Sequence, residues 1–130
     1  MAVEARGTVA VGGTVACMAR VRNIDTAAYI TKATVSTITY SIYSLDETTQ
    51  ARTAVTNHSA VSVTVATSVF DSLQTTLGWD EDTTGYNFRH VIDISTNAAF
   101  AIVNTTYIVE YTITPTSGQK IKVPFRVVAV

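Results

Sequence analysis

Apolar and polar residues alternate with a period of two through most of this chain. The clearest run covers residues 107–127, where two strands joined by a turn at 115–118 would each present one apolar face. Because successive side chains of a strand point to opposite faces, this pattern predicts a half-buried β-hairpin. Its apolar phase consists of Tyr107, Val109, Tyr111, Ile113, Ile121, Val123, Phe125 and Val127.

Pro124 lies within the second strand of this hairpin. Proline has no N–H to donate to a sheet, so we expect Pro124 on the unpaired side of an edge strand or at a bulge. At either place it would also discourage that edge from pairing with other chains.

Further strands are predicted upstream, at 14–22, 33–45, 60–67 and 86–94. In the second of these runs, Val35 is out of phase with Ile38 and Ile42. This mismatch predicts a bulge or a later strand start near Ser36. The polar run 46–56 is expected to be a turn or an excursion between strands.

One short helix is predicted near residues 69–76. Ser68 and Asp71 have the spacing of a capping box, with Asp in place of the usual Glu. Val69 and Leu73 would share one helix face. Such a helix would be only two turns long.

Six to seven strands with hairpins, longer connections and one short helix fit a two-layer antiparallel β-sandwich better than a closed barrel. Residues 14–130 are expected to form this single domain. Residues 1–13 alternate only weakly and end in the pair Gly12-Gly13, so we expect them to form an N-terminal arm.

Composition strengthens the prediction of an all-β fold. The β-branched residues Thr, Val and Ile supply 51 of the 130 residues, and Leu supplies only three. Branched side chains pack well on a pleated sheet and lose rotamer freedom in a helix. A chain of this length can also bury a core without disulfides or metal.

Charge and hydropathy exclude several classes of partner. Nine basic and ten acidic residues give a net charge of −1 without a basic cluster, which argues against nucleic acid. Apolar runs fall far short of the ~20 residues that span a bilayer, so no transmembrane segment is expected. Residues 1–20 lack the apolar core of a secretory signal peptide, and we expect folding in the cytoplasm.

The chain offers few groups for catalysis. Cys17 is the only cysteine, and His58 and His90 are the only histidines. No nucleophile, base and acid can be grouped from them, and no metal-ligand spacing occurs. We therefore expect no enzyme activity, no cofactor and no metal site, with Cys17 as a small buried residue and His90 as a hydrogen-bonded strand residue.

The loop before the 86–94 strand has two interpretations. Its acidic stretch 80–85 superficially resembles the start of a calcium loop, but Thr84 and Val91 stand where an EF-hand has ligands, which favours a solvated turn. Trp79 could be a sugar-stacking platform, extended by Tyr40, Tyr43 and Tyr86, or else an anchor in the core or loop.

Two resemblances add to these patterns. Tyr107-Ile108-Val109 resembles the tyrosine corner of immunoglobulin-like domains, with Val109 where antibodies have a cysteine. The stretch 79–130, with Trp79-Asp80, Gly85-Tyr86-Asn87-Phe88, Tyr107-Ile108-Val109-Glu110-Tyr111 and the Gly118 turn, resembles small structural proteins of tailed bacteriophages.

The second resemblance implies a virion component made in the host cytoplasm: a capsid decoration, neck, tail or baseplate subunit. Its partners would be further copies of itself, in a homo-oligomer, and other virion proteins, with contacts through strand edges and the arm Ala2 to Gly12. The alternative is an immunoglobulin-like adhesin or carbohydrate-binding module that uses the loop from Trp79 to Tyr86.

Overall fold

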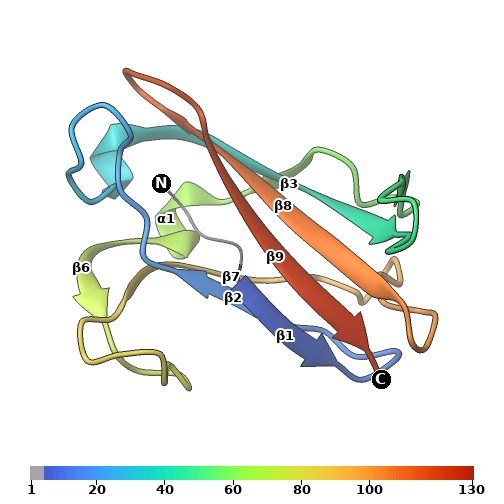
Figure 1. The fold of residues 1–130 in the computed structure, drawn as a ribbon. Coiled ribbons are helices and arrows are strands. Elements are labelled where there is room, and N and C mark those ends of the chain that lie inside the picture. The colour runs from blue at the N-terminus through green and yellow to red at the C-terminus, as the bar shows by residue number, and fades with distance from the viewer. Residues whose placement is uncertain (1–4) are drawn as a thin grey trace.

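The computed structural model describes residues 5–130, and their side chains from residue 7 onward. They form two β-sheets that face each other, with one short α-helix at the side (Figure 1). The predicted all-β sandwich is confirmed. No helix among these residues is long and apolar enough to cross a membrane.

The larger sheet has six strands. Its order is β1 (Ala5–Val9), β9 (Ile121–Ala129), β8 (Thr106–Pro115), β3 (Val35–Leu45) and β4 (Arg52–Ala54), with β5 (Val61–Val63) also paired to β3. The smaller sheet has the order β2 (Ala16–Ala19), β7 (Tyr86–Val91) and β6 (Val69–Gln74). Only β1 and β9 run parallel; the other pairs are antiparallel.

This strand order is that of an immunoglobulin-like sandwich. In that fold, neighbouring strands lie in the spatial order B-E-D in one sheet and G-F-C in the other. Here β2-β7-β6 correspond to B-E-D and β9-β8-β3 correspond to G-F-C, and the six strands follow one another along the chain in the same sequence. Residues 5–130 form nine strands, more than the expected six to seven, because β1 and the three-residue strands β4 and β5 join the larger sheet.

The core lies between the two sheets and follows the predicted alternation. All eight apolar positions of the C-terminal hairpin are buried, as are Cys17, Ile38, Tyr40, Ile42 and Phe88. The β3–β8 register shifts between Val35 and Thr37, which confirms the bulge near Ser36. Pro124 stands opposite Glu110 on β9, which lies between β8 and β1 and is therefore not the expected edge strand; among the described residues, the β1–β9 pairing begins at the next residue, Phe125.

The short helix lies elsewhere than predicted. Helix α1 is a single turn, Val65–Ser68, and most of the span predicted as helix forms strand β6. This segment pairs with β7 at Val69 and Gln74, and Val69 is completely buried, which outweighs the local capping signal. Asp71 instead accepts a hydrogen bond from the backbone N–H of Lys32, in the 3₁₀ turn η1 (Lys32–Thr34), at 2.8 Å.

The predicted arm is partly a strand of the domain. Ala5–Val9 forms β1 at the edge of the larger sheet, and Val9 is buried. The chain then turns at Gly12, whose φ of +82° favours glycine, and enters β2 in the opposite sheet. Residues 1–4 of the predicted arm lie outside the described residues.

The tyrosine corner is confirmed. The Tyr107 hydroxyl accepts a hydrogen bond from the backbone N–H of Ile102 at 3.1 Å. Its ring meets Phe100 edge-on, with the centroids 5.4 Å apart. The corner thereby fixes the connection that leads into β8.

Candidate functional site

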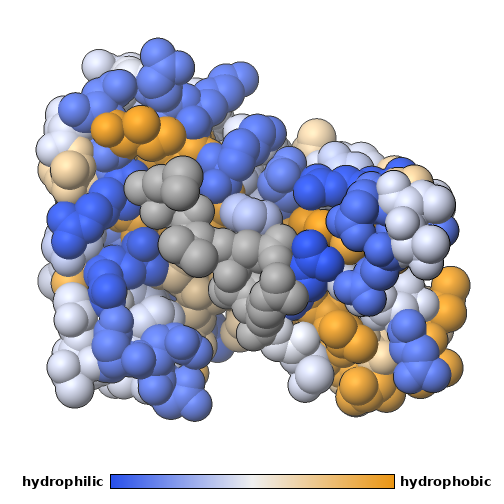
Figure 2. Space-filling view, viewed as in Figure 1, coloured by the Kyte–Doolittle hydropathy of each residue, from blue (hydrophilic) through white to orange (hydrophobic). Residues whose placement is uncertain are grey.

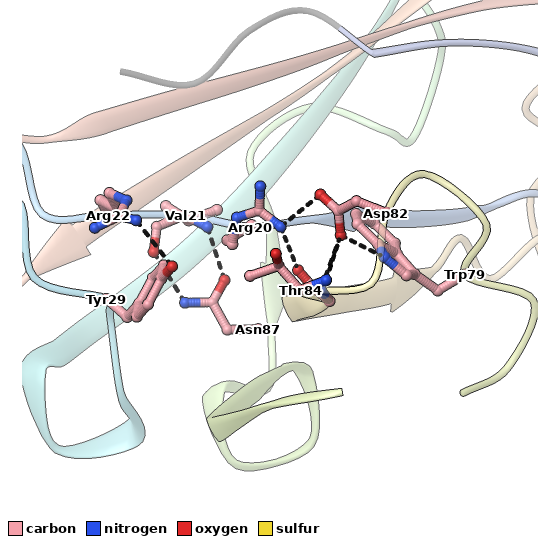
Figure 3. A network of polar contacts seen from close by, with 9 residues as sticks. Arg20, Val21, Arg22, Tyr29, Trp79, Asp82, Thr84 and Asn87 are labelled. Carbon is pink, nitrogen blue, oxygen red and sulfur yellow. Dashed lines mark hydrogen bonds and ion pairs between the residues drawn. The ribbon is translucent and has the colours of Figure 1, made fainter. Parts of the chain in front are cut away.

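The loop between β6 and β7 is organised by one carboxylate, that of Asp82 (Figure 3). One oxygen accepts hydrogen bonds from the Trp79 indole N–H at 3.1 Å and from the backbone N–H groups of Thr84 and Gly85 at 3.0 and 2.9 Å. The other oxygen pairs with the Arg20 guanidinium at 2.7 Å. Arg20 also donates to the Gly85 carbonyl at 3.0 Å, so β2 and the loop are tied together.

These donors stabilise the charged form of Asp82. The backbone hydrogen bond from Gly85, followed by that from Arg20, lowers the pKa of the carboxyl from 3.8 to about 2. Both oxygens are therefore engaged within the protein. Among the residues that the structure describes, no group of three or more His, Cys, Asp or Glu side chains is placed to hold a metal ion.

Gly85 is required by the shape of this loop. Its φ is +104°, and a Cβ at this position would overlap the backbone carbonyl oxygen of Gln74. Any side chain would push the loop away from the end of β6. The Asp82 contacts depend on this close approach.

Trp79 anchors the loop against the domain. Its ring lies 5.5 Å from that of the buried Tyr86 and its N–H is bonded to Asp82. Of the four aromatic residues suggested as a sugar platform, only Trp79 and Tyr86 lie together. Tyr40 is in the core, and Tyr43 packs under the guanidinium of Arg52 at 5.5 Å on the larger sheet.

A groove of about 190 Å³ lies beside this loop, where the edges of the two sheets approach each other. Trp79, Asp80 and Glu81 line one side, with Met18 and Val127 among the residues opposite. An indole face and two carboxylates can bind a polar ligand with an apolar face, as sugars have. The groove therefore offers binding groups.

Cys17 is also among the residues that line the groove. Cys17 is 2% exposed, and burial raises the pKa of its thiol to about 12. A thiol with this pKa is protonated at neutral pH and is a poor nucleophile. The prediction of a small buried cysteine is confirmed.

His58 is a core residue that the sequence did not reveal. It is 2% exposed although it follows the polar run 46–56. Its Nε2 lies 2.9 Å from the carbonyl of Asn97, which can only accept, so Nε2 carries the proton. Nδ1 is hydrogen-bonded to the Tyr40 hydroxyl at 2.9 Å. The ring thus links β3 to the 92–105 connection.

His90 and Asn87 likewise serve the fold. His90 Nδ1 is 2.8 Å from the buried Tyr111 hydroxyl, as expected for a hydrogen-bonded strand residue, and burial lowers its pKa below 6.5. Asn87 accepts from the Val21 N–H at 2.7 Å and donates to the carbonyls of Val21 and Ile30. It holds the 21–30 segment against β7. Alternation alone would have placed Asn87 on the solvent face.

Comparisons of the chain with protein-family models, with curated proteins and with solved structures found no match. Inside the sandwich, the hydrogen-bonding groups of His58, Asn87 and Tyr111 have partners in the same domain.

Replacing Asp82 should release Trp79. In Asp82→Ala the indole loses its acceptor and the loop loses its link to β2, so the fluorescence of the single tryptophan should shift to longer wavelength. Asp80→Ala, which removes an exposed carboxylate two residues away, is the matched control and should leave the spectrum unchanged. Equal spectra for wild type and Asp82→Ala would contradict the role given to this carboxylate.

The burial of His90 makes stability depend on pH. The unfolded chain protonates this ring near pH 6.5, whereas the folded domain resists protonation until a lower pH. The free energy of unfolding should therefore be fully retained above pH 6.5 and fall as the pH drops toward the folded pKa. Urea denaturation across this range should show a shallower fall for His90→Gln. An identical fall in both proteins would show that another group is responsible.

Proposed function

We propose that this chain is a non-enzymatic structural subunit that works through protein–protein contacts in a homo-oligomeric assembly. The observation that carries the proposal is a set of exposed apolar residues at one end of the sandwich, which we call the apolar end: Val11, Ile102, Val103 and Val130. Their exposed fractions are 42, 63, 54 and 61%. Contiguous exposed apolar surface of this kind is typical of protein contacts.

Backbone hydrogen bonds bring the apolar end together. Val11 donates to the carbonyl of Val130 at 3.1 Å, and Asn104 donates to that of Ala129 at 2.8 Å. The 101–104 turn is thereby fixed beside the end of β9. Figure 2 shows hydrophobic residues gathered where β1 and β9 end.

Open sheet edges also support assembly. Among the described strands, β1 has a neighbour only in β9, and β2 has a neighbour only in β7. Each presents backbone N–H and C=O groups on its other side, and strand addition at such an edge is a common mode of ordered contact. The resemblance of residues 79–130 to structural proteins of tailed bacteriophages supports a virion subunit of the capsid decoration, neck, tail or baseplate.

Sedimentation velocity over a range of concentrations tests the assembly role. Wild type should form oligomers, and Ile102→Ser with Val103→Ser should weaken self-association by about tenfold or more, because two apolar contacts are lost. Leu77→Ser is the matched control, since Leu77 is 62% exposed but lies in the loop before Trp79. A wild-type chain that is monomeric throughout and does not bind phage particles would contradict the proposal.

The groove beside Trp79 favours a second candidate, an adhesin or carbohydrate-binding module. Trp79 lines the groove together with two carboxylates that could accept hydrogen bonds from sugar hydroxyls. Calorimetric titration with a panel of oligosaccharides should give binding heat for wild type and none for Trp79→Ala. The absence of any signal in wild type would remove this candidate.

A further inference from the structure

Arg89 differs from the other arginines of the domain. Its Nε is buried without a hydrogen-bond partner, and its guanidinium makes no ion pair with residues 5–130. The other arginines with described side chains all have partners: Arg20 with Asp82, Arg22 with Tyr29, Arg52 with Glu110 and Arg126 with Glu47. A half-buried cation without a partner is costly, and such a group calls for an explanation.

The surroundings of Arg89 suit an incoming anion. Phe88 and His90 point into the core, so Arg89 lies on the outer face of the smaller sheet. Met18 stands directly opposite on β2, and Val91, which is 41% exposed, follows on the same face. An apolar surround strengthens a charge-assisted hydrogen bond to a carboxylate once water is excluded.

The same chain presents the complementary charge elsewhere. Asp80 and Glu81 are exposed, adjacent, and without a hydrogen bond or ion pair to the described residues. Asp82, the next residue, is held by Arg20, Trp79 and two backbone N–H groups. The two free carboxylates are therefore displayed on a loop whose shape is already fixed, which lowers the entropic cost of binding.

We propose that Arg89 of one copy binds the Asp80–Glu81 loop of a second copy. The contact pairs one residue with a loop of the second copy, so it can be made reciprocally in a two-fold dimer or from copy to copy in a ring or filament. The inference rests on the proposed assembly role and names one of its interfaces.

Charge reversal at each surface tests this contact. Arg89→Glu, and separately Asp80→Lys with Glu81→Lys, should each weaken self-association by about 30-fold or more. Arg89→Met keeps the bulk of the side chain without its charge and should also weaken self-association. Agreement between the two variants would show that the loss in Arg89→Glu is not a folding defect. Lys120→Glu, an equal charge change at an exposed turn, should have no such effect.

Mixing the two charge-reversed proteins gives the sharpest result. Arg89→Glu retains an intact loop and the loop variant retains Arg89, so a mixed pair can form the original contact, and in the other contact the introduced glutamate meets the introduced lysines. Native mass spectrometry should therefore detect mixed complexes that contain the two variants in equal number, which neither variant forms alone. The inference would be overturned if Arg89→Glu and Arg89→Met self-associated as strongly as wild type, or if no complex formed on mixing.

The experiments distinguish failure of the Arg89 contact from failure of the proposed function. Oligomers that depend on Ile102 and Val103 but not on Arg89 would leave the assembly role in place and remove this contact. A wild-type chain that is monomeric but binds phage particles would overturn this contact together with self-association, and leave only contacts with other virion proteins.

Discussion

The Tyr111 ring lies where the two sheets meet, and the rest of the fold is arranged around it. From β8 it contacts Phe88 and His90 of the opposite sheet, with centroids 4.8 and 5.5 Å apart. It also meets Tyr40 and Phe125 of its own sheet at 5.9 and 5.7 Å. Aromatic pairs of this kind contribute roughly 0.5–1.5 kcal/mol each beyond area burial. With its hydroxyl bonded to His90, this fully buried residue joins the sheets by both packing and hydrogen bonding.

This internal organisation determines what remains for function. The polar side chains His58, His90 and Asn87 act as ties between segments far apart in sequence. Asp82 does the same at the surface. Among the described residues, the domain presents outward an apolar end, the edges of β1 and β2, a groove beside Trp79 and the Arg89 surface.

The parts of the fold set by local alternation could be predicted from the sequence, and the parts set by distant partners could not. The hairpin of β8 and β9 and the bulge near Ser36 follow from a period of two and one break in it. Strand β6 was mistaken for a helix because its pairing partner, β7, lies beyond the next loop. His58 gave no signal in sequence, since its burial depends on Tyr40 and the Asn97 carbonyl. The Trp79 loop was recognised, but the clamp that shapes it depends on Arg20, far away in sequence.

Residue-resolved amide hydrogen exchange tests most directly whether the two sheets are held as one unit around Tyr111. The account predicts that core amides of β7 and β8, such as those of Phe88 and Tyr111, open only with global unfolding and give the same free energy of opening. Fast exchange throughout β7 beside slow exchange in β8 would contradict it, because the smaller sheet would then separate from an intact larger one.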